Sequence, residues 1–253
     1  MLFDFTGKCP SQDKPTKTNM KIMKTSKSTV AILAVGILSA IATRSAQATT
    51  AELELISGAT TIIVPDNGAG DTNPATGAVV WSGTINGWTV TFAGGTTKPV
   101  IGSVTTPNLD ISTFAVLSSG SGTLQVLFSD TGFGPTTGAA DSLITGSIQG
   151  SQTVVFTTYG GNSNTIFDTS NLLTSTGTLS GNFPTQFASG VLGAKTGPYS
   201  LTEELTLTGS GNSSLDARLT VPDGGSTVGL LGLALVGLGI VHFRLNGFKG
   251  LVS

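Results

Sequence analysis

The sequence predicts an all-β protein whose central part, residues 49–220, folds as an antiparallel β-sandwich with a jelly-roll-like strand order. Apolar side chains alternate with threonines and other polar residues along several short runs, which is the period-two pattern of strands buried on one face. Glycine-rich turn signals separate these runs, and none of the runs has the spacing of a helix. These observations favour about ten to fourteen short strands.

Two runs illustrate the alternation. Residues 88–92 place tryptophan, valine and phenylalanine between threonines, and residues 215–220 place leucine and alanine between charged or polar residues. Between residues 79–81 and 88–90, the dipeptide Asn86-Gly87 predicts a hairpin with a tight turn. A β-solenoid is the alternative architecture, but the sequence lacks the repeat of fixed period that a solenoid needs.

Residues 20–48 have the three parts of a secretory signal peptide. Three lysines precede the thirteen-residue apolar run 30–42, and small residues follow as far as Ala46 and Ala48. The pattern predicts a signal helix that signal peptidase removes by cutting before Thr49. A buried core helix or a lasting anchor is the alternative for this run. Residues 1–19 fit neither a helix nor a signal, and we interpret them as a disordered lead or a mis-assigned start.

The sequence also predicts a C-terminal transmembrane helix. Residues 228–243 are sixteen residues without charge, and adding 224–227 gives a helix of about 30 Å, the thickness of a bilayer core. Arg244 and Lys249 follow and predict a cytoplasmic stop, with 246–253 as a cytoplasmic tail. A plain membrane anchor is the alternative to an anchor that is later processed.

The turn motif, apolar helix and basic stop of residues 221–245 resemble a PEP-CTERM-type sorting domain, closest to the variant written VPDSG-CTERM. The motif reads Val221-Pro222-Asp223-Gly224-Gly225. Gly224 stands where that variant often has Ser, and the basic cluster is sparser than usual. The resemblance implies recognition of this motif by an exosortase, a membrane cysteine protease, and cleavage that releases the body. Pro222 and the two glycines predict an extended, accessible segment.

Much of the body is similar to a stretch of other exported proteins of the PEP-CTERM class. The resemblance covers residues 88–202 and includes the segments 97–103, 128–133 and 197–202. It implies an extracellular β domain and supplies no activity.

The side chains of residues 49–220 exclude several functions. Because the stretch contains neither histidine nor cysteine, catalytic triads, thiol chemistry and a zinc site of the usual ligands lack their parts. Eleven acids and three bases give the stretch a net charge of −8, which disfavours nucleic acid as a partner. No glycine-rich phosphate loop leads into a helix, and we expect no cofactor and no metal.

Three further possibilities depend on geometry. Glycoside hydrolysis needs two carboxylates on facing strands, whereas Glu203 and Glu204 are adjacent and point to opposite faces of a strand. Residues 66–73 offer oxygen ligands for calcium, although a solvated turn is the favoured interpretation. Aromatic side chains stack on sugars if they share an exposed face, but alternation with apolar residues argues for burial of Trp88. The aromatic candidates are Trp81, Trp88, Tyr159 and Tyr199.

We therefore expect a non-enzymatic protein that is exported, held at the inner membrane by its C-terminal helix, and sorted to the cell surface or the extracellular matrix. Its expected partners are signal peptidase, an exosortase, the membrane and extracellular polysaccharide. A structural or adhesive role in the envelope or biofilm is the first hypothesis. A carbohydrate-binding module of the exopolysaccharide matrix is the alternative, and a hydrolase that uses two acids is the third.

Overall fold

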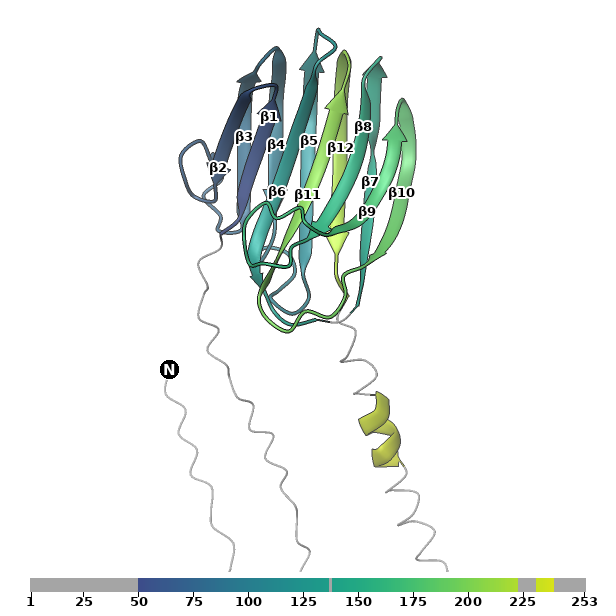
Figure 1. Ribbon diagram of the computed structural model, residues 1–253. Coiled ribbons are helices and arrows are strands. Elements are labelled where there is room, and N and C mark those ends of the chain that lie inside the picture. Colours follow the sequence, from purple (N-terminus) through teal and green to yellow (C-terminus); the bar gives the residue numbers. More distant parts are fainter. Residues whose placement is uncertain (1–49, 137, 223–230, 239–253) are drawn as a thin grey trace, which may run out of the picture. The chain divides into compact units, whose positions relative to one another are not determined.

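The computed structural model describes residues 50–136, 138–222 and 231–238 (Figure 1). Residues 50–222 contain twelve β-strands. The strands are β1 (Glu52–Ser57), β2 (Thr60–Pro65), β3 (Ala78–Ile85), β4 (Trp88–Thr96), β5 (Asn108–Ser118), β6 (Thr123–Phe133), β7 (Ala139–Gly150), β8 (Thr153–Gly160), β9 (Leu172–Leu179), β10 (Asn182–Val191), β11 (Tyr199–Thr208) and β12 (Gly211–Thr220).

These strands form two six-stranded antiparallel sheets that pack face to face (Figure 1). Sheet A has the order β2-β1-β6-β11-β8-β9, and sheet B has the order β10-β7-β12-β5-β4-β3. The prediction of an all-β sandwich is confirmed, and the alternative of a β-solenoid is wrong.

The last eight strands pair in a nested order. β5 pairs with β12, β6 with β11, β7 with β10, and β8 with β9. A long hairpin of four strand pairs that rolls up on itself has this order, which is the order of a jelly roll. The hairpins β1–β2 and β3–β4 extend the two sheets beside β6 and β5. The nesting places residues that are distant in sequence side by side, as with Asn108 and Thr220.

Alternate side chains of both sheets fill the space between them, as in other sandwiches. The large side chains of Trp88, Phe128, Phe156 and Tyr199 are fully buried there. The two sheets approach closely at Gly95 of β4, where a Cβ atom would lie 2.1 Å from the ring of Phe128 on the opposite sheet. Only glycine therefore fits at position 95 without displacing that ring.

The turn between β3 and β4 confirms the predicted hairpin. Ile85 pairs with Trp88, so that Asn86 and Gly87 form a two-residue connection. Their φ angles are 45° and 86°. A type I′ turn needs positive φ at both central positions, and asparagine and glycine adopt that conformation most readily.

The predicted terminal signals lie wholly or largely outside the described residues. The apolar run 30–42 and the predicted cleavage site before Thr49 are not among them. In the C-terminal stretch residues 231–238 are helical, and Leu231 and Leu235 are exposed rather than part of the core. Within the part of the chain that is described, no helix combines the length and the apolar character needed to cross a membrane. The signal helix and the transmembrane helix stay predictions.

Candidate functional site

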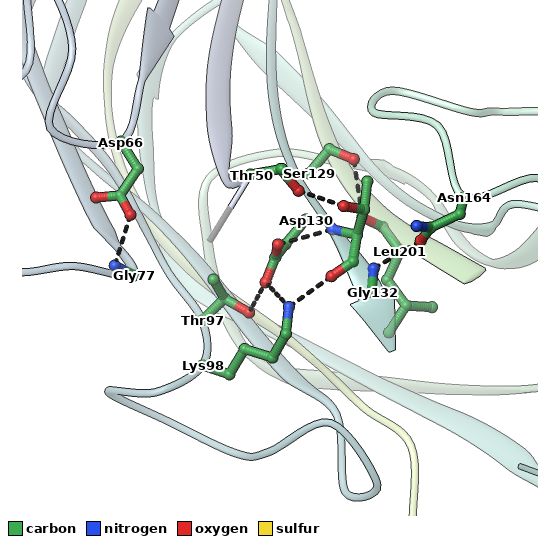
Figure 2. A network of polar contacts seen from close by, with 11 residues as sticks. Thr50, Asp66, Gly77, Thr97, Lys98, Ser129, Asp130, Gly132, Asn164 and Leu201 are labelled. Atoms are coloured by element: carbon green, nitrogen blue, oxygen red, sulfur yellow. Dashed lines mark hydrogen bonds and ion pairs between the residues drawn. The ribbon is translucent and has the colours of Figure 1, made fainter. Parts of the chain in front are cut away.

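A buried ion pair joins the two sheets at one end of the sandwich (Figure 2). Lys98 lies two residues beyond the end of β4 in sheet B, and Asp130 lies in β6 of sheet A. The Nζ atom of Lys98 is 2.5 Å from Oδ2 of Asp130, and the two side chains are 9% and 0% exposed. Thr97, Lys98, Asp130 and Thr131 are named the Lys98 network below.

Every charged atom of the Lys98 network has further partners. The hydroxyl of Thr97 donates to Oδ2 of Asp130 at 3.0 Å, and the backbone N–H of Thr131 donates to Oδ1 at 2.7 Å. Nζ of Lys98 also donates to the carbonyl oxygen of Thr131 at 2.6 Å and lies 4.2 Å from the ring centre of Phe133. Burial nevertheless raises the pKa of Asp130, although the charge and hydrogen bond of Lys98 oppose that shift.

The loop after β8 covers sheet A beside this network. Asn164 accepts a hydrogen bond from the N–H of Gly132 at 2.6 Å, and the N–H of Phe167 donates to the hydroxyl of Ser129 at 3.0 Å. A depression of about 600 Å³ lies over residues 162–170. Within it, hydrogen bonds from Ser170 and Ser163 lower the pKa of Asp168. Asp168 therefore stabilises the loop through these hydrogen bonds. We interpret the depression as a consequence of the loop's structure and not as a binding site.

A second polar group lies on the outer face of sheet A and centres on Glu204. This carboxylate accepts hydrogen bonds from Nε2 of Gln125 at 2.7 Å, from the hydroxyl of Thr206 at 2.7 Å and from the hydroxyl of Tyr159 at 3.2 Å. Burial and the adjacent charge of Glu204 raise the pKa of Tyr159 to about 12. Tyr159 is thus a hydrogen-bond donor at neutral pH and remains uncharged.

Glu203 points into the core, so the prediction of opposite faces for Glu203 and Glu204 is confirmed. Its side chain is fully buried, and its carboxyl oxygens form no well-aligned hydrogen bond with the described residues. Burial, followed by the negative charge of Asp110, raises the pKa of Glu203 well above its usual range. The charge of Arg218 and the backbone N–H of Leu219 offset only part of that shift.

Exposed apolar side chains gather on the outer face of sheet B. Phe92 of β4 pairs with Phe114 of β5, and Phe114 is 60% exposed. At the far side of the same sheet, Phe187 of β10 is 77% exposed. Between them, Arg218 of β12 forms an ion pair of 3.2 Å with Asp110 of β5. Phenylalanine rings beside charged and hydroxyl groups form an amphipathic surface.

The four aromatic residues that the sequence suggested for sugar stacking do not form such a surface. Trp88 and Tyr199 are 1% exposed. Trp81 packs against the core, and Tyr159 is held by Glu204 on sheet A. The expected burial of Trp88 is therefore confirmed. The residues that sequence reasoning missed are phenylalanines of sheet B.

Sequence reasoning also missed the Lys98 network, although two signals in the sequence indicate it. Continuing the alternation of Leu124, Val126 and Phe128 by one step places Asp130 on the apolar face of β6. Lys98 is one of only three bases in residues 49–220, and a buried acid needs one of them. The alternation of buried Leu109, Ile111 and Thr113 extends one step to an outward-facing Phe114, a signal that sequence reasoning did not use. The irregular backbone at Ala115, where φ is 50°, changes only the residues beyond it.

In the turn of residues 66–73, which offers oxygen ligands for calcium, the carboxylates accept hydrogen bonds from backbone groups. Asp71 accepts from the N–H groups of Asn67, Asn73 and Val80, each at 2.9 Å. Asp66 accepts from the N–H of Gly77 at 2.8 Å. These contacts stabilise the turn itself. In the described ranges, no three acidic, histidine or cysteine side chains lie close enough together to hold a metal ion.

The first residue of the predicted sorting motif belongs to the sandwich. Val221 is fully buried, and its N–H donates to the carbonyl oxygen of Pro107 at 3.0 Å. Pro222 is exposed. The expectation of an accessible segment therefore does not hold for Val221. The remaining predicted site residues lie outside the described residues; they are Ala46, Ala48, Thr49, Asp223, Gly224, Gly225, Arg244 and Lys249.

Comparison with known proteins identifies no family. No family model matches the chain, and no curated protein matches it. One similar solved structure is that of TmCBM61 in complex with β-1,4-galactotriose. The likeness has a TM-score of 0.28 and 9% sequence identity, and it covers 54% of this chain and 90% of that chain. A TM-score of this size does not establish a common fold.

Proposed function

We propose that this chain is an exported surface protein whose β-sandwich is sorted through residues 221–225 and displayed in the cell envelope or biofilm matrix. The main support is the position of Val221, which is the last buried residue of the sandwich. The sandwich thus ends where the sorting motif begins. A protease that cuts after Val221 would release a domain with an intact core.

In this proposal the body is a structural or adhesive module and not an enzyme. Several carboxylates of the described residues have structural partners: Asp66 and Asp71 accept hydrogen bonds in a turn, and Asp168 does so in a loop. Asp130 is paired with Lys98, and Glu203 lies in the core without access to substrate. A two-carboxylate hydrolase needs a pair of acids that face one cleft.

The experiment is fractionation of the tagged chain in its native host and in a strain without the exosortase. Export predicts loss of the residues before Thr49 in both strains. Sorting predicts loss of residues 231–253 from the mature protein in the native host alone, as read from intact mass. A mature protein that keeps residues 231–253 in both strains would contradict sorting and leave a plain anchor.

Carbohydrate binding is the second candidate, and the outer face of sheet B favours it. Phe92 and Phe114 are neighbours on adjacent strands, and Asp110 and Arg218 supply hydrogen-bonding groups on the same face. Sugar rings stack on aromatic faces and bind polar groups at the margin. The face is therefore suited to an extended polysaccharide.

Affinity electrophoresis in gels that contain the host exopolysaccharide tests this second candidate. Phe114→Ala should abolish any retardation of the wild-type protein. Ile63→Ala is the matched control, because Ile63 is 52% exposed but lies on β2 of the other sheet. Equal retardation of the wild type and of both variants would show that the polysaccharide binds outside the outer face of sheet B. If the wild type is not retarded, carbohydrate binding is contradicted as a function.

A further inference from the structure

The Lys98–Asp130 pair connects two layers that no disulfide can connect. The only cysteine of the chain, Cys9, lies far upstream of the sandwich in sequence. Lys98 and Asp130 are 32 residues apart: Lys98 lies in the turn after β4 of sheet B, and Asp130 lies in β6 of sheet A. A covalent bond between them would close a loop across the core, as a disulfide does in other exported proteins.

The geometry of the pair suits a reaction between its members. Nζ of Lys98 is 2.5 Å from Oδ2 of Asp130, so it lies within roughly 4 Å of the carboxyl carbon, close to the separation of a near-attack conformer. The carbonyl oxygen of Thr131 accepts a second hydrogen bond from Nζ and holds the amine in place. The two groups are thus preorganised by the fold.

The surroundings favour attack on the carboxyl carbon. The hydroxyl of Thr97 donates to one oxygen of Asp130 and the N–H of Thr131 donates to the other, so both polarise the carboxyl group. The ring of Phe133, itself fully buried, faces the amine and excludes water. Burial raises the pKa of Asp130, which favours the protonated carboxyl group that must lose an oxygen.

We propose that Lys98 and Asp130 condense after folding into an intramolecular isopeptide bond that ties sheet A to sheet B. A proton passes from the ammonium group of Lys98 to Oδ2 of Asp130, and the neutral amine attacks Cγ. The Nζ–Cγ bond forms, the Cγ–Oδ2 bond breaks, and the oxygen leaves as water with a second proton from Nζ. A cation and an anion become one neutral amide and one water, so the step needs no oxidant or cofactor.

Neutralisation supplies the driving force. A buried ion pair carries the desolvation penalty of two charges, and only good geometry and additional hydrogen bonds offset it. The amide has no charge. Its N–H keeps the carbonyl oxygen of Thr131 as a partner and its C=O keeps the N–H of Thr131, whereas the hydroxyl of Thr97 loses its acceptor when Oδ2 leaves. Water released at this end of the sandwich leaves to the solvent, which disfavours the reverse reaction in a closed core.

The test is a peptide map of the full-length wild-type protein, denatured before digestion with chymotrypsin. The crosslink predicts one branched species that contains both Lys98 and Asp130. Its mass should be below the sum of the two linear peptides by one water, about 18 Da. Because the measurement uses the wild-type protein, it does not depend on the stability of any variant.

Two variants sharpen the result. Asp130→Asn keeps the shape of the side chain but removes the carboxylate oxygen that takes the proton of Lys98, so it should abolish the branched species. Asp110→Ala, which removes the exposed ion pair with Arg218, should still give the branched species, with the same loss of one water relative to its own linear peptides. If Lys98 and Asp130 of the wild type appear only in separate linear peptides, the pair is an ordinary ion pair and the proposal is wrong.

Discussion

Glu203 and Glu204 are consecutive residues of β11 that lie in opposite environments. The carboxyl group of Glu203 is buried between the sheets without a well-aligned hydrogen bond, whereas Glu204 accepts three hydrogen bonds on the outer face of sheet A. The same substitution at the two positions should therefore change stability in opposite directions.

Glu203→Gln should remove a pH dependence of stability. Because the pKa of Glu203 is raised on folding, the folded chain keeps a proton that the unfolded chain releases above its ordinary pKa of 4.5. The carboxyl group thus lowers the free energy of unfolding as pH rises above that value, by about 1.4 kcal/mol per pH unit until the folded pKa is reached. Urea unfolding from pH 5 to pH 8 measures this slope, which should be steeper in the wild type than in Glu203→Gln.

Glu204→Gln is the matched control. It replaces an acceptor of three hydrogen bonds by an amide with one acceptor oxygen, so it should lower the free energy of unfolding by about 1 kcal/mol. Equal slopes for the wild type and for Glu203→Gln would show that Glu203 is charged in the folded protein.

Replacing Lys98 alone should lower the free energy of unfolding more than replacing both Lys98 and Asp130. Lys98→Met leaves Asp130 buried without its partner and should lower the free energy of unfolding by about 3–5 kcal/mol. The double variant Lys98→Met with Asp130→Leu has no buried charge and should be more stable than Lys98→Met alone. Chemical denaturation of both variants measures the difference.

Arg218→Met is the control for this comparison. The ion pair of Arg218 with Asp110 has side chains that are 46% and 20% exposed, so its loss should change stability by less than about 1 kcal/mol. A double variant less stable than Lys98→Met would mean that the polar contacts of Asp130 with Thr97 and Thr131 outweigh its burial.

The sequence predicts those structural features that depend on neighbouring residues, and it does not predict contacts between residues that are distant in the chain. The alternation of Trp88 and Val90 with threonines and the dipeptide Asn86-Gly87 correctly predict a strand and its hairpin, because both follow from the backbone of a few neighbouring residues. The alternation fails at Phe92, which pairs with Phe114 on the outer face of sheet B instead of lying on the buried face with Trp88 and Val90. The partner of Asp130 is not local: Lys98 lies 32 residues away in the turn after a strand of the other sheet, and only the packing of the sheets brings it near.

Irregular backbone limits the prediction of surfaces. The register between β5 and β12 shifts between Ser213 and Leu215, opposite Ala115 with its positive φ. Such a bulge reverses the alternation beyond it, so Phe114 and Leu117 both face outward although they are three residues apart. The outward position of Leu117 therefore could not be predicted from the alternation, whereas that of Phe114, which precedes the bulge, could.

Gly95→Ala should destabilise the sandwich because a Cβ atom at this position would overlap the ring of Phe128. The ring or the sheet must move, and overpacking of this kind lowers the free energy of unfolding by about 1–3 kcal/mol. Gly120→Ala is the control, since a Cβ there would meet nothing within 4 Å. Thermal melts of the two variants should differ, and equal melting temperatures would contradict the close approach of the sheets at Gly95.

Asp71→Ala should destabilise the turn of residues 66–73. The substitution removes the acceptor for the N–H groups of Asn67, Asn73 and Val80, with an expected loss of about 1–3 kcal/mol. Asp216→Ala, an exposed acid of β12, should stay within about 0.5 kcal/mol of the wild type. The same melts with calcium added separate the two interpretations of the turn: a calcium-dependent rise in the wild type that Asp71→Ala abolishes would favour a metal site.

The sorting motif should separate into a residue of the fold and residues of the signal. Val221 is fully buried and bonded to Pro107, so Val221→Ala should lower the free energy of unfolding by about 2 kcal/mol. Pro222 is exposed, so Pro222→Ala should leave the melting temperature unchanged and still prevent removal of the C-terminal residues in the native host. Melts of the purified variants and intact masses from the host measure the two effects. Normal processing of Pro222→Ala would contradict a role for Pro222 in the sorting signal. Pro222 is not packed in the core, so recognition by the protease is the role that the motif assigns to it.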